Sequence, residues 1–135
     1  MIRRQFGGGD IVDAAERMGV AAHLSKRPFE LSGGELRRAE VAAIFVRAPR
    51  CLLADEPYRG ITPKDAEDLT RAFRELAAGG MAIVVTGHDV PTLLHAADHV
   101  SWCTSGTTYE LGRPAIATQH HAFRRDYLGS WFSSF

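Results

Sequence analysis

Residues 51–57 have the sequence CLLADEP, in which four apolar residues precede two adjacent acids and a proline. An apolar run without polar alternation is typical of a strand that is buried on both faces of a parallel sheet. Pro57 then stops the strand. We therefore expect a fully buried strand at 51–54, with the carboxylates of Asp55 and Glu56 just beyond its carboxyl end.

Helical and strand-like patterns alternate on both sides of this segment. Apolar residues recur at helical spacing after Asp10, after Ser32 and over 64–77, whereas 81–86 and 100–104 form short apolar runs. This alternation predicts an α/β fold, mainly a parallel sheet with covering helices. In such sheets the chemical groups collect beyond the carboxyl ends of the strands.

Finer expectations concern single elements. Residues 107–111 should pair with 100–104 as a hairpin, 115–128 is weakly helical, and 20–30 is a short helical or loop segment. Both cysteines, Cys51 and Cys103, lie in apolar runs and are expected as buried thiols. The helix after Ser32 should turn three charged residues to solvent, namely Arg37, Arg38 and Glu40. Its expected apolar face comprises Leu36, Ala39, Ala43 and Val46.

Composition bounds the function only broadly. The 135 residues carry 16 basic and 16 acidic side chains, so the formal net charge is zero. Such a balance gives no general attraction to nucleic acid, and none is expected as a partner. No apolar run has the length of a membrane span, so direct membrane insertion is not expected either.

The acid pair after the expected strand suits phosphoryl chemistry. Asp55 is a hard oxygen ligand of the kind that Mg²⁺ prefers, directly or through water. Glu56 is placed to polarise a water molecule for attack on a phosphoryl group. The competing interpretation is that the two acids only begin a turn before Pro57. The pair alone does not separate these two interpretations.

A second chemical motif is LSGGE at residues 31–35. Its structural interpretation is a capping box, in which Ser32 caps a helix and Glu35 reaches back to the Ser32 amide. Gly33 and Gly34 weaken the first turn of a helix, which is reasonable where another molecule must approach the bare backbone. The helix start would then bind an anion, with the Ser32 hydroxyl as a further donor. Capping and anion binding are compatible.

A histidine follows the second expected strand. His88 lies between Gly87 and Asp89, where a ring N–H can donate to a terminal phosphate. A lone histidine is more often a surface or core residue, and its position after a buried strand is what favours a role. The remaining histidines have no such placement and are taken as surface residues: His23, His95, His99, His120 and His121.

The three motifs together resemble one family. In order and spacing, LSGGE at 31–35, CLLADEP at 51–57 and VVTGHD at 84–89 are similar to the signature, Walker B and switch-histidine motifs of ATP-binding cassette domains. The resemblance runs from about residue 10 to about residue 112. It implies a partial P-loop NTPase fold of the ABC type.

The resemblance also implies a division of the chain and roles for its residues. A flexible segment at 1–9 would precede part of the helical subdomain at 10–48, part of the ATPase core at 49–112, and a helix and frayed tail at 113–135. Ser32 and Gly34 would contact the γ-phosphate of a nucleotide held by an opposing cassette, and Gly33 and Glu35 would belong to the same nucleotide-binding segment. Asp55 would be the Mg²⁺-associated carboxylate, Glu56 the catalytic carboxylate and His88 the switch histidine. Thr62 departs from the family, whose members commonly carry Asp there.

One family motif is missing from these 135 residues. No Gly-x-x-x-x-Gly-Lys-Ser/Thr occurs, and the two lysines, Lys26 and Lys64, follow no glycine-rich loop. That loop supplies most of the backbone N–H groups around ATP phosphates. We therefore expect the isolated chain neither to bind ATP usefully nor to hydrolyse it, and we expect exposed sheet edge and core surface. The missing part would lie upstream or on a separate chain.

The resemblance implies an ATP-hydrolysing subunit of an ABC transporter, with ATP and Mg²⁺ as cofactors. The expected partners are a second cassette, in a homo- or heterodimer, and membrane-spanning transporter subunits that hold it at the cytoplasmic face. Two alternatives stay open. One is a cassette ATPase of DNA repair, chromosome maintenance or translation, and the other is a non-catalytic module that lends its signature face to a partner.

Overall fold

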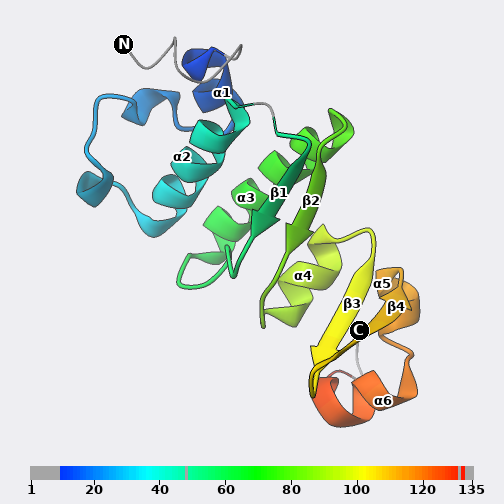
Figure 1. Cartoon of the computed structure of the whole chain (residues 1–135). Helices are drawn as coiled ribbons and strands as arrows, with labels where there is room; N and C mark the ends of the chain where they lie inside the picture. Colours follow the sequence, from blue (N-terminus) through cyan, green and yellow to red (C-terminus); the bar gives the residue numbers. More distant parts are fainter. Residues whose placement is uncertain (1–9, 48, 131, 133–135) are drawn as a thin grey trace. The chain divides into compact units, whose positions relative to one another are not determined.

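The computed structural model of the chain describes residues 10–47, 49–130 and 132 (Figure 1). It forms two compact units, with the division between Asp89 and Val90. The expected flexible segment at 1–9, and residues 131 and 133–135 of the expected frayed tail, lie outside the described residues. Among the described helices, none has both the length and the apolar composition of a membrane span.

The first unit begins with a capped helix, as the sequence predicts. The side chain of Asp10 accepts a hydrogen bond from the amide of Val12 at the start of α1 (Ile11–Arg17), and Gly19 follows the helix with a φ of 67°. Met18 is almost fully buried. Two 3₁₀ turns, η2 (Ala21–His23) and η3 (Pro28–Glu30), then lead to the next helix.

The helix after Ser32 is present, but its buried face is not the expected one. In α2 (Gly33–Phe45) Val41 and Ala42 are buried, Ala43 is exposed, and Arg38 is buried instead of facing solvent. The reason is that α2 packs against both α1 and α3, so that its contact surface is wider than one stripe. The charge of Arg38 is compensated across that contact by an aspartate of α3.

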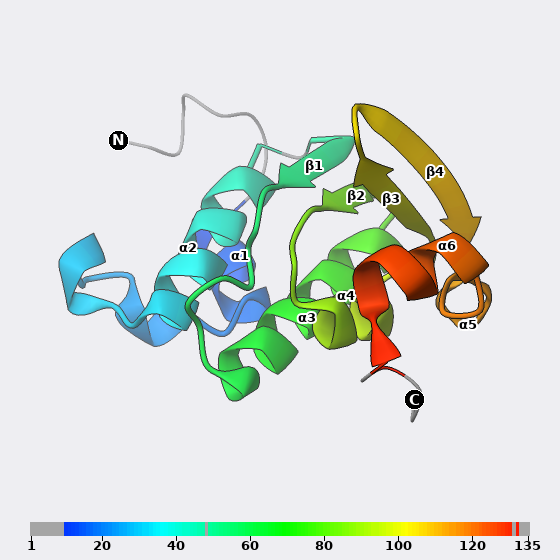
Figure 2. The ribbon, with the colours of Figure 1, turned by 90° about the horizontal axis from the view of Figure 1, so that it is seen from below.

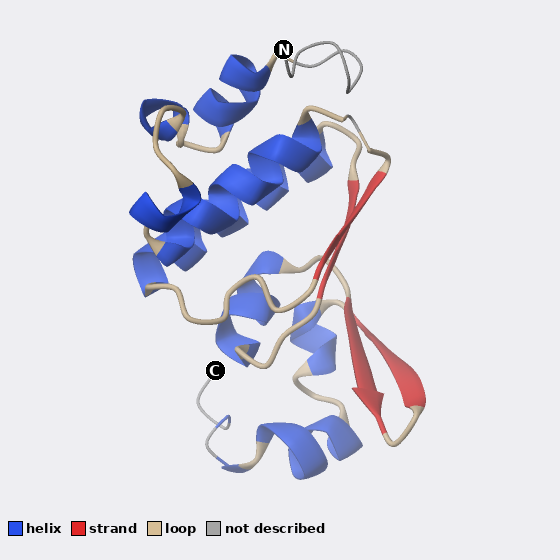
Figure 3. Cartoon of the chain, turned by 60° about the vertical axis from the view of Figure 1, so that its left-hand side comes forward, coloured by secondary structure: helices blue, strands red, loops and turns tan. Residues whose placement is uncertain are grey.

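The central element of the first unit is a pair of parallel strands. Strand β1 (Cys51–Ala54) pairs with β2 (Ala82–Val85), and the long helix α3 (Pro63–Ala78) connects them. Figures 2 and 3 show α3 along one side of the strand pair. The apolar side of α3 is buried there, including Leu69, Phe73 and Leu76, and it anchors the unit's core.

Only one face of β1 is buried in this structure, which corrects the expectation of burial on both faces and agrees with the expectation of exposed core surface. Leu52 is buried, whereas Leu53 is 75% exposed and Val84, its partner in register, is 51% exposed. Cys51 is likewise exposed, against the expected buried thiol. The cause is that, in the described part of the chain, helices cover one face of a sheet of two strands.

The second unit contains the predicted hairpin. Helix α4 (Val90–Ala96) precedes β3 (Val100–Thr104), which pairs antiparallel with β4 (Thr107–Gly112). Ser105 and Gly106 both have positive φ, as the type I′ turn of a two-residue hairpin requires. Strand β3 therefore belongs to its own two-stranded sheet and does not extend the parallel one. Cys103 on β3 is exposed, against expectation.

Short helical segments close the core of the second unit. They are α5 (Pro114–Ala117), α6 (His121–Phe123) and the π-turn η4 (Arg124–Leu128), which agree with the weak helical pattern over 115–128. Their buried residues pack with β4 and with the ring of Trp102. The core cluster comprises Leu111, Ala117, Phe123 and Leu128.

Candidate functional site

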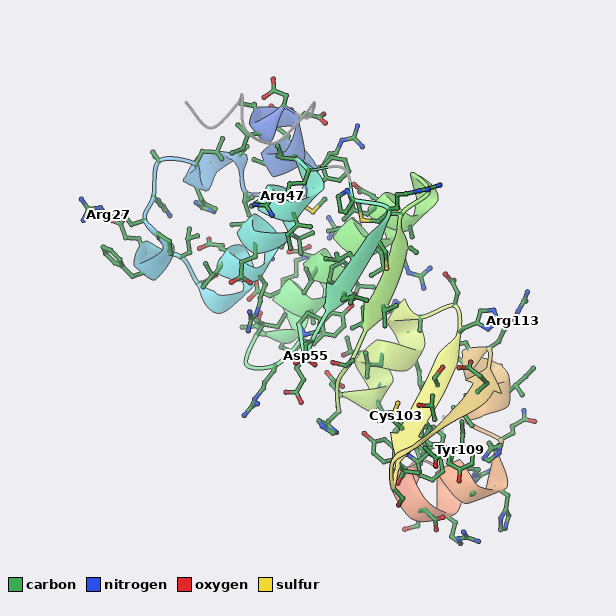
Figure 4. The ribbon with its side chains drawn as sticks, in the orientation of Figure 1. Arg27, Arg47, Asp55, Cys103, Tyr109 and Arg113 are labelled. Atoms are coloured by element: carbon green, nitrogen blue, oxygen red, sulfur yellow. The ribbon has the colours of Figure 1, made fainter. Side chains whose placement is uncertain are left out.

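The acid pair directly follows β1, whose last residue, Ala54, pairs with Val85 at the end of β2. Figure 4 labels Asp55 at this end of the strand. The amide of Thr86 donates to the carbonyl of Ala54 at 3.0 Å, which extends the strand pairing by one step. The Thr86 hydroxyl donates to Asp55 Oδ1 at 2.5 Å and accepts from the backbone amide of Glu56 at 3.1 Å. One hydroxyl group therefore fixes the Asp55 carboxylate and the Glu56 backbone together.

Glu56 has an unusual backbone conformation. Its φ is 45°, in the left-handed region that non-glycine residues seldom adopt, and such residues collect at functional sites. The turn after it is anchored on α3, because Tyr58 is buried with its hydroxyl 2.9 Å from Thr70 Oγ1. Burial raises the pKa of the Tyr58 hydroxyl above its usual value. The surrounding structure thus holds Glu56 in a conformation that the residue alone does not favour.

The carboxylate of Glu56 lies between two nitrogen-bearing side chains. Arg59 Nη1 donates to Glu56 Oε2 at 3.3 Å, and His88 Nε2 lies 3.4 Å from Glu56 Oε1. The His88 side chain is 80% exposed, and that of Glu56 is 31% exposed. The structure therefore brings the three predicted residues of this site, Asp55, Glu56 and His88, to one accessible sheet end.

The oxygen atoms at this sheet end suit a magnesium ion. Mg²⁺ usually takes one or two carboxylates and completes its shell with water and substrate phosphate. Asp55 is exposed and offers one carboxylate, with the Thr86 hydroxyl oxygen beside it. Among the described residues no group of three or more acidic, histidine or cysteine side chains is arranged for a metal. One carboxylate with a hydroxyl oxygen beside it is a donor set that suits an ion shared with a phosphate ligand.

The LSGGE segment forms the capping box that its sequence predicts. Ser32 Oγ accepts from the amide of Glu35 at 3.2 Å, and Glu35 Oε2 accepts from the amide of Ser32 at 2.8 Å. The Ser32 amide lowers the pKa of the Glu35 carboxyl, and the charge of His23 adds to this effect. Because Ser32 Oγ accepts this bond, its own O–H remains able to donate to a ligand.

His23 is not the surface residue that the sequence suggested. Its Nε2 lies 3.0 Å from Glu35 Oε1, and its side chain is 21% exposed. The η2 turn carries the ring toward the start of α2, a placement that sequence spacing does not reveal. His95, His99, His120 and His121 are exposed, as expected.

The two glycines of this segment have different surroundings. Gly33 is exposed, and a Cβ built there would make only ordinary contacts, 3.5 Å from the Gly60 carbonyl oxygen and from Ile61 Cγ2. Gly34 is buried against Asp65. The expected open backbone is thus found at Gly33 and not at Gly34. Gly60 and Ile61 therefore lie close to Gly33, which places the LSGGE segment near the loop that follows Glu56.

Three residues with a place in this geometry were missed by sequence reasoning. They are Thr86, Arg59 and Asp65. Thr86 follows β2 at the same sheet end as Asp55, so the strand-end rule was sufficient to select it. Arg59 and Asp65 carried no comparable signal, because their contacts depend on the turn at Glu56 and on the packing of α2 against α3.

Curated relatives share the sequence over most of this chain. It is 38% identical over 103 residues to the energy-coupling factor transporter ATP-binding protein EcfA2 of Streptococcus sanguinis strain SK36. It is 37% identical over 103 residues to the protein of the same name from Streptococcus pyogenes serotype M5 strain Manfredo. Each alignment covers 76% of this chain and 37% of the relative, so the chain spans little more than a third of those proteins. No family model matches the chain.

Solved structures share the fold. A nucleotide-free ATP-binding cassette from an ABC transporter matches with a TM-score of 0.77 at 22% identity, over 81% of this chain and 44% of that one. CbiO1 of Clostridium perfringens, part of the ABC transporter complex cbiONQ, matches with a TM-score of 0.74 at 24% identity, over 82% and 44%. By sequence and by fold, the chain belongs to the ATP-binding cassette family and spans part of its ATP-binding domain.

Proposed function

We propose that the chain supplies the signature and acid-bearing part of the ATP-hydrolysing subunit of an ABC transporter. The observation that carries the proposal is that Asp55, Glu56 and His88 lie together at one sheet end, and that the loop after Glu56 passes close to the LSGGE segment. The names of the curated relatives support transport as the process that hydrolysis drives. On this proposal, residues 10–48 belong to the helical subdomain and 49–112 to the ATPase core.

The chain's own residues divide the work of phosphoryl transfer. Asp55 would hold Mg²⁺, whose charge stabilises the phosphates when it is bound. Glu56 would accept a proton from the attacking water, a step that typically contributes about 10²- to 10⁴-fold in rate. His88 would donate an N–H to the terminal phosphate and orient the water between phosphate and Glu56.

The LSGGE segment would act on a second nucleotide, held by an opposing cassette. The Ser32 hydroxyl and the Gly33 backbone are exposed at the start of a 13-residue helix, where the helix dipole favours an anion. We therefore propose a second cassette and membrane-spanning transporter subunits as partners, with the chain on the cytoplasmic side. Gly34 and Glu35 would fix the conformation of this turn, Gly34 by packing against Asp65 and Glu35 by accepting from the Ser32 amide.

Completion of the nucleotide site requires a phosphate-binding loop from elsewhere. The uncovered face of β1 and β2, with Leu53 and Val84, is the surface that we propose such a polypeptide segment packs against. Purely parallel sheets are almost always covered on both faces, which supports this proposal. The segment would lie upstream in the same polypeptide or arrive as a separate chain.

The test compares the chain alone with the completed cassette. Calorimetric titration of the isolated chain with Mg-ATP should show no sub-millimolar binding. Joined to the phosphate-loop part of an EcfA2 relative, the chain should bind and hydrolyse ATP. In that cassette Glu56→Gln should preserve binding and stop turnover, whereas Glu67→Gln, an exposed control on α3, should leave turnover intact.

Two outcomes would go against the proposal. Normal turnover in Glu56→Gln would remove Glu56 from the mechanism. A completed cassette that binds nucleotide without hydrolysing it would favour the non-catalytic module, in agreement with the unusual Thr62.

A further inference from the structure

The first turn of α2 packs directly on the start of α3, through a glycine and an aspartate. A Cβ built on Gly34 would lie closer than 3.0 Å to Asp65 Cγ, Oδ1 and Cβ. Cβ atoms in proteins essentially never approach other heavy atoms below that distance. The Asp65 side chain therefore fills the space that any other residue type at position 34 would need.

Two other residues hold the Asp65 carboxylate in this place. Thr62 Oγ1 donates to Asp65 Oδ2 at 2.8 Å and accepts from the Asp65 amide at 3.2 Å. Arg38 Nη1 donates to Asp65 Oδ1 at 3.1 Å from the buried face of α2. Asp68, one turn further along α3, lies 3.9 Å from the same Arg38 nitrogen. Both oxygens of Asp65 are thus engaged, one by a residue of α2 and one by the cap of α3.

Comparison of Gly33 with Gly34 distinguishes two explanations for a glycine at position 34. One is access for a phosphate, and the other is packing against the Asp65 side chain. If both were glycine only to admit a phosphate, both would have open surroundings. Gly33 has ordinary contacts and is exposed, whereas Gly34 is covered by the side chain of Asp65. The backbone dihedrals do not explain the difference, because neither glycine has a positive φ.

We propose that Asp65 is a positioning residue. Its side chain packs on Gly34 and, with Arg38 and Thr62, holds the Ser32–Glu35 turn against the loop that follows Glu56. We call this arrangement the lock. Any shift of that loop would then move the start of α2. The lock is a property of this chain by itself. Its use in aligning the signature segment with the acid site rests on the proposed function.

The proposal also gives Thr62 a role. The family resemblance leads one to expect a carboxylate at position 62, and here a hydroxyl stands there. The carboxylate is supplied by Asp65, three residues further on, and Thr62 becomes its hydrogen-bond partner. A Thr62–Asp65 pair thus takes the place of a single aspartate at the start of α3.

A suppressor experiment tests whether the Asp65 side chain packs on Gly34. Thermal unfolding of the 135-residue chain is followed for Gly34→Ala, Asp65→Gly and the double variant, with Gly33→Ala as the matched control. We expect Gly34→Ala to lower the midpoint by roughly 5–15 °C because of overpacking. Gly33→Ala should leave the midpoint unchanged or raise it, since alanine favours a helix.

The double variant decides the result even if Gly34→Ala does not fold. Once Asp65 is replaced by glycine, which removes its Cβ as well as its carboxylate, the methyl group introduced at position 34 has space, so the double variant should be at least as stable as Asp65→Gly alone. The proposal is overturned if Gly34→Ala behaves as Gly33→Ala does. It is equally overturned if the double variant loses the sum of the two single losses.

Amide hydrogen exchange tests positioning apart from overall stability. Asp65→Ala should speed exchange of the Glu35 amide, which donates to Ser32 Oγ, by at least about tenfold more than global unfolding explains. Asp68→Ala is the control, because Asp68 also faces Arg38, whereas the atoms nearest to a Cβ at Gly34 belong to Asp65. Equal effects of the two variants at Glu35 would contradict the lock. No nucleotide enters these measurements, so their failure is distinguishable from failure of the proposed function.

Discussion

At the scale of single residues, hydroxyl groups organise the carboxylates. Thr86 binds the side chain of Asp55 and the amide of Glu56, and Thr62 binds the side chain and amide of Asp65. A hydrogen bond to a charged group contributes more to stability than one between neutral groups, about 1.5–3 kcal/mol against about 1 kcal/mol. Small polar residues at strand and helix ends therefore have larger effects here than their exposure suggests.

Replacement of Thr86 by valine should show this directly. The change keeps the shape of the side chain but removes the donor to Asp55 and the acceptor for Glu56, at a cost of about 0.5–1.5 kcal/mol in the free energy of unfolding. Urea denaturation measures the loss. Thr86→Ser keeps the hydroxyl and should retain most of the stability, so equal losses in both variants would count against the hydrogen bonds as the cause.

The decline of the unfolding free energy at low pH, here called the acid limb, provides a second prediction at this scale. The hydrogen bond from Thr62 and the charge of Arg38 lower the pKa of the Asp65 carboxyl in the folded chain. A lowered folded-state pKa means stability that is present above the unfolded value of about 3.9 and is lost as pH falls through the folded one. Asp65→Asn should therefore flatten the decline of unfolding free energy below about pH 4–5.

Urea denaturation at several pH values between about 3 and 7 checks this slope. Asp13→Asn on the exposed side of α1 is the control and should keep the wild-type decline. An unchanged slope in Asp65→Asn would show that other carboxylates carry the acid limb. Glu35 and Asp68 are the next candidates, since their pKa values are lowered as well.

At the scale of elements, each of the helices α1, α2 and α3 starts at a side-chain cap. Asp10, Ser32 and Thr62 accept backbone amides at these three helix starts. For α2 the cap coincides with the proposed phosphate-binding turn, because Ser32 uses an oxygen lone pair for the helix and keeps its O–H. Local helix formation and ligand binding thus depend on the same residue without competing for the same atom.

Ser32→Ala should therefore cost stability before any ligand is present. Loss of an N-cap serine typically costs about 0.5–2 kcal/mol, which urea denaturation resolves. Ser25→Ala, in the loop before η3, is a control at an exposed serine outside a helix start. A Ser32→Ala variant as stable as Ser25→Ala would mean that the capping box contributes little to this chain.

At the scale of the whole molecule, the described part of the chain forms two compact units and leaves an apolar face of β1 and β2 uncovered. The face belongs to the first unit and is built in register, with Leu53 opposite Val84 and Cys51 opposite Ala82. Burial of a Leu or Val side chain contributes about 1.5–3 kcal/mol of favourable free energy. Covering the exposed pair would therefore strongly favour association. Exposed strands with apolar side chains are also sites of aggregation.

Polar replacement on that face should reduce self-association of the chain. Leu53→Lys with Val84→Thr is expected to lower the apparent mass at high concentration in analytical ultracentrifugation while the unfolding midpoint stays close to wild type. Leu52→Lys, directed at the buried face, should instead unfold the first unit. Unchanged association in the double variant would place the contact elsewhere.

The sequence by itself determined the elements and their ends. Apolar runs, helical spacing and caps predicted β1, α3, β2 and the β3–β4 hairpin within a residue or two, and the strand-end rule selected Asp55, Glu56 and His88. These features depend on local propensity and on period, which neighbouring residues fix. The tertiary structure decided which faces are buried and which distant residues meet. Arg38 faces inward, Leu53 faces outward, and Asp65 sits on Gly34, because each of these outcomes depends on packing between elements that are far apart in the chain.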